Sequence, residues 1–238
     1  MTTYVYGITR AGQRDLPEDL TGIGDPPLPV RTVTGSGLAA VVSDCPRELR
    51  PKRRDLLAHQ QVVTEIGRRA PVLPMRFGSV SDSDDAVRDV LAEHGGRYEK
   101  RLEELAGRVE YNVKVVHRED AVLHRVLAED AGLRTLAEAN RASGGGSYEQ
   151  RLRFGEMVAE RVREREDRDA ELVRETLAPL AEKTRTGPEN AGCFLSLSFL
   201  VDESAARRLL TETGRLEKEN PHVALSVHGP LPPYSFVE

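Results

Sequence analysis

The sequence contains no tryptophan and only two cysteines, and the scarcity of cysteine limits the class of protein it can encode. Cys45 and Cys193 are too few for a disulfide framework and too far apart for a Cys-x-x-Cys pair. Both lie in or beside apolar, strand-like runs, where a small buried thiol is the ordinary interpretation. We therefore expect neither a disulfide-rich domain nor a cysteine-based metal site.

Long apolar runs and a surplus of basic residues are also missing. No run approaches the roughly 20 residues that a membrane-spanning helix requires, and the N-terminus lacks the basic start and apolar core of a signal peptide. The net charge is −5, whereas a general nucleic-acid binder needs a basic face that neutralises phosphates. These features predict a cytoplasmic protein with no membrane span and no nucleic-acid partner.

Motifs of catalysis and of cofactor binding are absent from the sequence. It contains neither GxxxxGK[ST] nor HExxH, and no clustered cysteines and histidines. His59, His94 and His222 stand alone, and His117 ends a predicted strand, so it need not face His124. We interpret all five as surface or hydrogen-bonded histidines. Serine, histidine and aspartate are too dispersed to nominate a triad, and we predict no catalytic residue, no cofactor, no metal and no enzyme.

Strand-like and helical segments alternate along the first half of the chain, in the order β-β-α-β-α. The predicted strands cover residues 3–8, 38–42 and 70–80, and the predicted helices cover residues 52–69 and 82–107. Pro74 interrupts the third strand, because proline cannot donate to a strand ladder, and this places the strand at an edge or a bulge.

Both helices of the first half are amphipathic. Ser81 or Asp82 is expected to cap the second helix, and Gly95-Gly96 predicts a kink or break in it. The expected inner face of the first helix consists of Leu56, Leu57, Gln60, Val63, Ile66 and Gly67. The expected inner face of the second helix consists of Val87, Val90, Leu91, Tyr98, Leu102 and Leu105.

The second half predicts the order β-α-α-β-α-β. Its strands are expected near residues 110–115, 194–201 and 223–228, and its helices over 120–129, 148–184 and 203–219. Pro179 should end or bend the long helix. Every residue from Glu160 to Asp169 except Val162 is charged, which indicates a solvated face or, alternatively, a helix that meets a partner. The last two strands should be joined by a crossover and lie parallel or one strand apart.

This order predicts an α+β protein of two small α/β-sandwich domains of the ferredoxin-like type. The first domain is expected over residues 1–108. The second is expected over 109–238, with a long charged helical segment inserted at about 118–185 and a proline-rich tail.

The segment Val72–Gly78 places a proline, a cation and an aromatic ring in one predicted strand. We favour an edge strand with Met75 and Phe77 on one side and Pro74 and Arg76 on the other. The alternative is a contact surface for a partner, formed by the arginine and the aromatic ring. Met75, Arg76 and Phe77 are therefore candidate protein-interaction residues, together with Tyr4 and Tyr6 of the first strand.

The C-terminal segment Gly229–Val237 carries three prolines and two aromatic rings, whereas chain ends are usually small, polar and frayed. Proline restricts φ, so this segment has less conformational freedom to lose when it docks. We favour docking on the last sheet of its own domain. A partner surface is the alternative, in which Tyr234 and Phe236 would be contact residues.

Four motifs together resemble the gas vesicle protein F/L family (GvpF/GvpL). They are Tyr4–Ile8, Val72–Gly78, Glu110–Lys114 and Gly229–Val237, which occur in the family's order and span nearly the whole chain. Related sequences often carry an aromatic residue where Leu231 stands here, a small departure that concerns local packing.

The resemblance implies a two-domain α/β protein without enzymatic activity that acts in gas vesicle assembly. It further implies partners, namely the hydrophobic major shell protein and other accessory gas vesicle proteins, and a location at the gas vesicle. Two alternatives remain open at this point: a small-molecule-binding or catalytic α/β protein, and a structural constituent of the finished particle.

Overall fold

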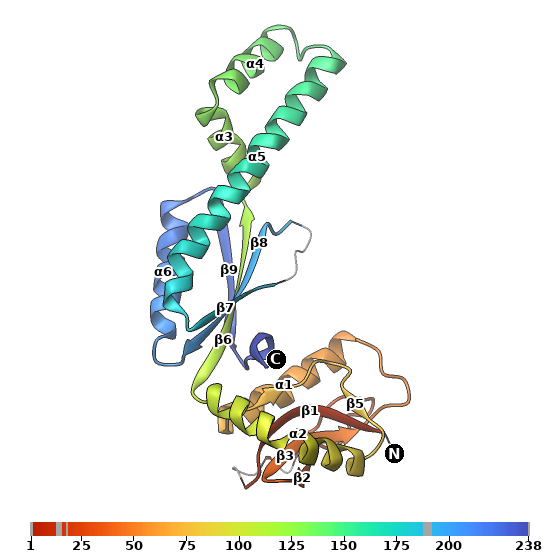
Figure 1. Ribbon diagram of the computed structural model, residues 1–238. Coiled ribbons are helices and arrows are strands. Elements are labelled where there is room, and N and C mark those ends of the chain that lie inside the picture. Colours follow the sequence, from red (N-terminus) through yellow and green to blue (C-terminus); the bar gives the residue numbers. More distant parts are fainter. Residues whose placement is uncertain (1, 13–15, 18, 188–191, 238) are drawn as a thin grey trace. The chain divides into compact units, whose positions relative to one another are not determined.

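The chain forms two compact units in a computed structural model that describes residues 2–12, 16–17, 19–187 and 192–237 (Figure 1). Unit 1 comprises Met1–Glu110 together with Gly229–Glu238, and unit 2 comprises Tyr111–His228. By its contacts the C-terminal segment groups with unit 1, while residues 229–231 also end the last strand of the second sheet, on which we expected the segment to dock. No helix among the described residues is both long and apolar enough to cross a membrane.

Unit 1 is an antiparallel sheet with two long helices. The sheet has the order β2-β3-β1-β4, and β5 also pairs with β1. The bounds are β1 Thr3–Arg10, β2 Arg31–Gly35, β3 Leu38–Asp44, α1 Arg53–Arg69, β4 Leu73–Pro74, β5 Val80–Ser81 and α2 Asp84–Glu104; the short 3-10 helix η2, Tyr234–Phe236, belongs to the C-terminal segment.

The core of unit 1 lies around β3, which is buried at every position from Leu38 to Ser43. Val41 packs in an apolar cluster with Tyr4 and Tyr6 of β1 and with the inner face of α1. Helix α2 contacts β1, β2 and β3. Successive side chains of a strand alternate between faces, so burial along the whole of β3 requires cover on both faces of the sheet.

The segment after α1 differs from the single strand that we predicted over residues 70–80. Of this segment only β4 and β5 form strands, and both pair with β1. Between them Ser79 N–H donates to Arg76 O at 3.2 Å in a turn where Gly78 has φ of +93°. The prediction of one continuous strand is therefore wrong, although Met75 and Phe77 are half-buried and Arg76 between them is exposed. Pro74 does lie in an edge strand, as its missing N–H predicts. Strand β2 was not predicted.

Which residues of a helix are buried depends on hydrogen bonding as well as on hydrophobicity. On α1 the buried positions are Asp55, His59, Val62, Val63 and Ile66, whereas Leu56 and Leu57 are 42% and 55% exposed. The prediction that these two leucines face inward was wrong. Asp55 is buried in their place, where it accepts a hydrogen bond from Gly24 N–H at 3.0 Å.

Helix α2 begins at Asp84, two residues later than expected, and is not broken. Ser83 caps it by accepting a hydrogen bond from Ala86 N–H at 3.1 Å. The helix continues through Gly95 and Gly96, and Gly95 is buried near Ser36 of the β2–β3 turn. Of the predicted inner face, Val90 is 41% exposed.

Unit 2 combines a four-stranded sheet with four helices. Its bounds are β6 Arg108–His117, α3 Glu119–Glu129, α4 Ala131–Ala142, α5 Tyr148–Leu177, η1 Ala178–Leu180, β7 Lys183–Thr186, β8 Leu195–Asp202, α6 Ala206–Glu219 and β9 Val223–Leu231. The end of α5 at Leu177 agrees with the helix-breaking effect of Pro179. Helix α4 and strand β7 were not predicted.

The sheet of unit 2 has the order β7-β8-β6-β9. Phe194 N–H donates to Val115 O, and Arg118 N–H donates to His222 O, so the end of β6 meets the starts of both β8 and β9. Strands β8 and β9 are therefore both antiparallel to β6 and lie one strand apart, as predicted. With α5 and α6 as crossovers, this is the ferredoxin-like βαββαβ order, which the strands of unit 1 do not follow.

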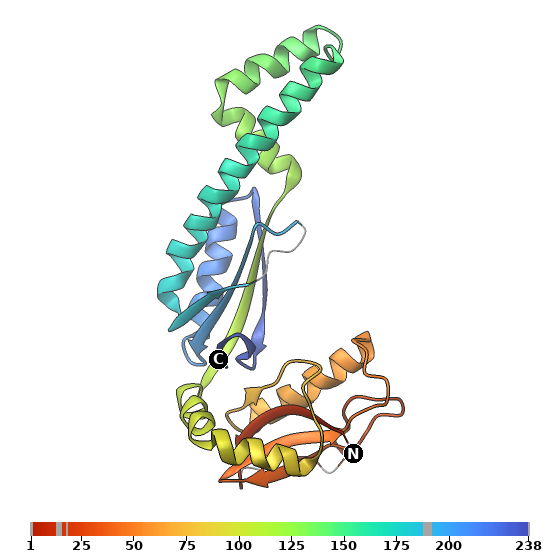
Figure 2. The ribbon, with the colours of Figure 1, turned by 45° about the vertical axis from the view of Figure 1, so that its right-hand side comes forward.

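Helices α5 and α6 lie side by side against one face of this sheet (Figure 2). The buried residues of α5 all lie in its second half, from Asp169 to Leu177. The first half contacts α3 and α4 instead, and together they form a helical arm (Figure 1). The predicted solvated face from Glu160 to Asp169 is correct only in part, because Asp169 itself is 1% exposed.

Candidate functional site

The C-terminal segment is anchored through Ser235 to Glu110 of β6. The backbone N–H of Ser235 donates to Glu110 Oε2 at 2.8 Å, and its hydroxyl donates to Glu110 Oε1 at 2.6 Å. Glu110 is 1% exposed, and a buried carboxylate is stable only when hydrogen-bonded or paired. One residue of the C-terminal segment therefore satisfies both oxygens of a buried acid.

Two further contacts fix the same segment. A Cβ atom placed on Gly67 of α1 would lie 3.5 Å from Pro232 Cγ, which shows how closely the proline ring approaches this helix. The ring of Tyr234 lies 6.5 Å from that of His59, centroid to centroid. Burial, together with the negative charge of Glu110, raises the pKa of the Tyr234 phenol. Phe236 is 2% exposed and completes the docked segment.

Tyr234 packs against an aromatic cluster of unit 1. Tyr4 lies at its centre, with ring centroids 4.9 Å from Tyr6, 5.7 Å from His59 and 5.9 Å from Phe77. Edge-to-face pairs at such distances contribute about 0.5–1.5 kcal/mol beyond their buried area. The cluster joins β1, α1 and the β4–β5 turn into one surface, against which Tyr234 is placed.

Hydrogen bonds hold this cluster in one arrangement. His59 Nε2 lies 3.0 Å from Met75 O and must donate, because a carbonyl only accepts; His59 Nδ1 then accepts from the Tyr4 hydroxyl at 2.8 Å. Burial lowers the pKa of His59, which keeps its imidazole neutral. The Tyr6 hydroxyl accepts from Ile23 N–H at 2.9 Å and lies 3.0 Å from Ser43 Oγ.

Most of the candidate interaction residues thus meet in one place. Tyr4, Tyr6, Phe77 and Tyr234 belong to the aromatic cluster or pack against it. Tyr4 and Tyr6 are fully buried, so in this structure they belong to the core against which Tyr234 packs and do not present a surface to a partner. Met75 contributes its backbone carbonyl, and Arg76 is exposed.

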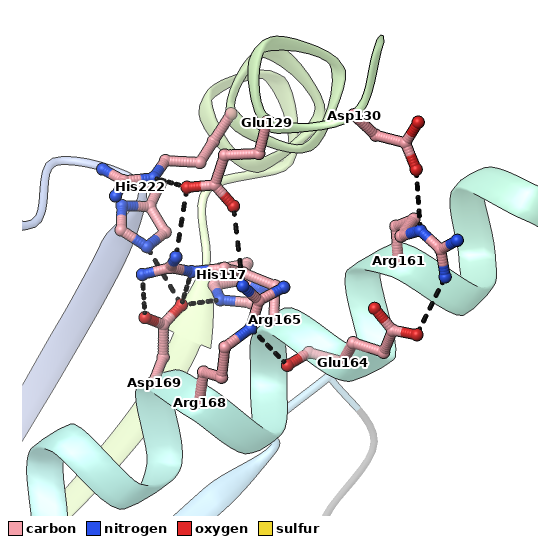
Figure 3. A network of polar contacts seen from close by, with 10 residues as sticks. His117, Glu129, Asp130, Arg161, Glu164, Arg165, Arg168, Asp169 and His222 are labelled. Carbon is pink, nitrogen blue, oxygen red and sulfur yellow. Dashed lines mark hydrogen bonds and ion pairs between the residues drawn. The ribbon is translucent and has the colours of Figure 1, made fainter. Parts of the chain in front are cut away.

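A second candidate site lies in unit 2, around the carboxylate of Asp169 (Figure 3). His117 Nε2 and His222 Nε2 lie 2.8 and 2.9 Å from Asp169 Oδ2. Arg165 donates from Nε to Oδ2 at 3.0 Å and from Nη2 to Oδ1 at 2.7 Å. The side chains of His117, Asp169 and His222 are 7%, 1% and 2% exposed. The end of β6, helix α5 and the residue before β9 therefore meet at one buried charge.

The electrostatics of this Asp169 cluster follow from its geometry. Burial alone would raise the pKa of Asp169, but hydrogen bonds from His117 and Arg165 and the charge of Arg165 outweigh it, so this pKa lies well below its usual value. Burial lowers the pKa of His222, which Asp169 offsets only in part. The cluster therefore consists of a carboxylate, a guanidinium and a neutral His222.

A wider ion-pair network connects the Asp169 cluster with the helical arm. Arg165 also lies 3.2 Å from Glu129 at the end of α3, and Arg161 pairs with Asp130 at 2.8 Å (Figure 3). Asp130 caps α4 by accepting from Leu133 N–H at 3.0 Å. The charged stretch of α5 thereby fastens α3 and α4 to the helix that covers the sheet.

Two histidines and an aspartate are residue types that can bind a metal ion, and their ligand atoms lie within 4.8 Å of one another. Two observations disfavour an ion here. The guanidinium of Arg165 already occupies the same carboxylate, and the buried Nδ1 atoms of His117 and His222 have no partner among the described residues. Metal-bound histidines almost always donate their second ring N–H to an acceptor. The cluster fits a hydrogen-bonded ion pair better.

The sequence did not predict this cluster, because His117 and His222 are far apart along the chain and each stands alone among its neighbours. Residues 117, 169 and 222 show no motif spacing. A usable signal was that His117 ends one strand and His222 directly precedes another, which become neighbours in the sheet. His124 is exposed, and His94 lies beside Tyr98 with ring centroids 5.9 Å apart.

The architecture, two α+β units over the full chain, is that of crystal structures of gas vesicle proteins. The structure of GvpF from Anabaena sp. PCC7120 matches with a TM-score of 0.77 and 21% identity, over 100% of this chain and 98% of that one. GvpF from Microcystis aeruginosa matches with a TM-score of 0.73 and 18% identity, over 100% and 99%. At such identities the likeness establishes the fold.

The sequence comparisons establish the family. The family model "Gas vesicle synthesis protein GvpL/GvpF" matches residues 2–238, so this chain belongs to that family. It is 54% identical to "Gas vesicle protein F" of Streptomyces sp. (strain CB03234) over 238 residues, the full length of both chains. It is also 29% identical to "Gas vesicle protein L" of the same strain, over 98% of this chain and 91% of that one.

Proposed function

We propose that this chain is an assembly factor of gas vesicles that binds the hydrophobic major shell protein and other accessory gas vesicle proteins. The observation that carries the proposal is membership of the GvpL/GvpF family along the whole chain, together with 54% identity to a gas vesicle protein F. The physical need is plain, since a shell subunit with exposed apolar surface aggregates unless a partner covers it before polymerisation.

Edge strands are the surfaces that we propose for binding the shell protein. Strand β2 ends the sheet of unit 1 and strand β7 ends the sheet of unit 2. All four residues of β7 are exposed, as are Thr32 and Thr34 of β2. An extended segment of a partner can add to such an edge through main-chain hydrogen bonds.

A matched pair of proline variants tests the edges. Thr34→Pro in β2 and Thr184→Pro in β7 each place proline, which cannot donate to a strand ladder, at an exposed threonine of an edge strand. Each variant is checked for native circular dichroism and then used to capture purified shell protein. Loss of capture in one variant assigns the edge. Unchanged capture in two folded variants contradicts edge pairing, and no capture by the unsubstituted chain contradicts the proposed function itself.

A catalytic or small-molecule-binding role would require buried titratable groups that open into a pocket. The Asp169 cluster offers no such access, because its side chains are at most 11% exposed, Arg165 included. The remaining alternative is a permanent constituent of the particle. Detection of the protein in washed vesicles separates a constituent from a transient assembly factor.

A further inference from the structure

We infer that the groove between helices α5 and α6 of unit 2 binds an acidic amphipathic helix of a partner protein. The groove shares no residue with the edge strands β2 and β7 that we propose for binding the shell protein. A partner can therefore occupy it whether or not an edge strand is occupied. The length of the groove, its charge and the composition of the first turn of α6 all favour such a ligand.

The groove follows the two helices along their length. Helices α5 and α6 lie side by side on the sheet (Figure 2), and the space between their outer surfaces has a volume of about 720 Å³. Thr176 of α5 and Leu180 of η1 line one side, and the residues that line the other side are Ser204, Arg207, Arg208, Thr211, Glu212 and Arg215. From residue 207 to residue 215 α6 rises roughly 12 Å, or about two turns. A helix of a partner fits between two packed helices over such a length.

The two sides of the groove differ in chemistry. On the side of α5, Leu180 is half-buried, and Leu172, which is 36% exposed, lies one turn before Thr176 and so continues the same side of the helix. On the side of α6, Arg207 and Arg208 are exposed. An amphipathic helix with apolar residues on one face and acidic residues beside them complements both sides.

The groove is positively charged although the chain as a whole is acidic. Three arginines and one glutamate line it, whereas the net charge of the chain is −5. Glu212 pairs with Arg215 at 2.7 Å, so these two charges compensate each other. Arg207 and Arg208 form no ion pair with any residue that the structure describes. Two positive charges are therefore available to a partner, and complementary charges across an interface steer and orient the ligand.

The same two arginines are unfavourable for α6 itself. They occupy its second and third positions, where the partial positive charge of the helix dipole favours acidic residues. Helix α6 has no acidic residue in its first turn and no side-chain cap. Residues that break a local rule of this kind are expected at functional sites. Carboxylates of a bound helix would supply the negative charge that this turn lacks.

Charge reversal tests the groove without endangering the fold. The double variant Arg207→Glu and Arg208→Glu places two acidic residues where the helix dipole favours them, so it should melt at the same temperature as the unsubstituted chain or higher. The double variant Arg153→Glu and Arg163→Glu is the matched control, because it makes the same change in net charge at two exposed arginines of α5 in the helical arm.

The probe is a labelled helical peptide of about 15 residues with leucines on one face and glutamates beside them. Fluorescence anisotropy should show that it binds the unsubstituted full chain and the control variant alike. Binding to the α6 variant should be weaker by about 10-fold or more, because repulsion replaces attraction. The same peptide with glutamine in place of glutamate should bind the unsubstituted chain as weakly. Hydrogen exchange should show that the bound peptide protects residues 204–215.

Several outcomes would overturn the inference. One is that the folded unsubstituted chain does not bind the acidic peptide, or binds the glutamine peptide equally well. Another is that the control variant loses as much affinity as the α6 variant, because net charge alone would then attract the peptide. Displacement by inorganic phosphate at the concentration of the peptide would assign the groove to small anions instead of a helix. Capture of the shell protein is measured separately with the proline variants, so failure here leaves the proposed function untouched.

Discussion

Ser235 donates two hydrogen bonds to Glu110, a residue 125 positions earlier in the chain. This pair links the last residues of the protein to the boundary between its two units, since unit 2 begins at Tyr111. It also explains why a terminal segment is ordered, because a buried carboxylate depends on it.

Replacing Ser235 should destabilise unit 1. Ser235→Ala removes the hydroxyl that donates to Glu110 Oε1 at 2.6 Å, and we expect a loss of about 1–3 kcal/mol in the free energy of unfolding, the usual cost of leaving a buried acceptor unpaired. Ser235→Thr keeps the hydroxyl and is the control. Urea unfolding measures both, and equal stability of the two variants would show that the hydroxyl does not matter.

Removing the hydroxyl of Tyr6 should also destabilise unit 1. Tyr6→Phe leaves Ile23 N–H without its acceptor at 2.9 Å, and Tyr6 is fully buried, so we expect a loss of about 1–3 kcal/mol. Tyr148→Phe is the matched control, because Tyr148 is 75% exposed and should change stability by less than about 0.5 kcal/mol. A loss no larger than that of the control would contradict the role of this hydrogen bond.

Neutralising Asp169 should destabilise unit 2 more than either change in unit 1. Asp169→Asn keeps the size of the side chain but removes the carboxylate charge that Arg165, 11% exposed, contacts through two hydrogen bonds, and breaking a buried pair costs about 3–5 kcal/mol. Asp167→Asn changes an exposed aspartate on the same helix and serves as the control. Thermal unfolding followed by circular dichroism compares the two, and similar melting temperatures would argue against a structural role for the cluster.

Acidification should weaken unit 2 in two stages. The pKa of His222 is lowered by burial from its usual 6.5, so below that pH the unfolded chain binds a proton more readily than the folded one and stability falls. Arg165 and Arg125 oppose protonation of His222, and Asp169 favours it.

The second stage comes from Asp169, whose pKa is also lowered, from a usual value of 3.8. The stability that its charge contributes is present above that pH and is lost as the pH falls through and below it. Urea unfolding between pH 8 and pH 3 measures both stages. Asp169→Asn should show a smaller second stage, because Glu129 and Asp130, whose pKa values are also lowered, still contribute to it. A stability independent of pH from 8 to 3 would refute both assignments.

Local sequence patterns predicted the helices and strands in which buried residues recur at a regular spacing along the chain. The three-to-four spacing of Val63 and Ile66 identified α1, and the alternation of Tyr111, Val113 and Val115 identified β6. Short elements were missed, because β2 and β7 have five and four residues and carry little hydrophobic pattern. Strand β7 is fully exposed, so nothing in its composition distinguishes it from a loop.

The sequence by itself determined the family, through four motifs in order, and most of the succession of helices and strands. Only the tertiary structure decided that the C-terminal segment docks on α1 as well as on Glu110 of β6 in the last sheet, and that His117, Asp169 and His222 meet in one buried cluster. The physical reason is the range of the interactions. Periodicity records contacts between residues two to four positions apart, whereas hydrogen bonds between residues 52 to 125 positions apart depend on how the sheets and helices are assembled.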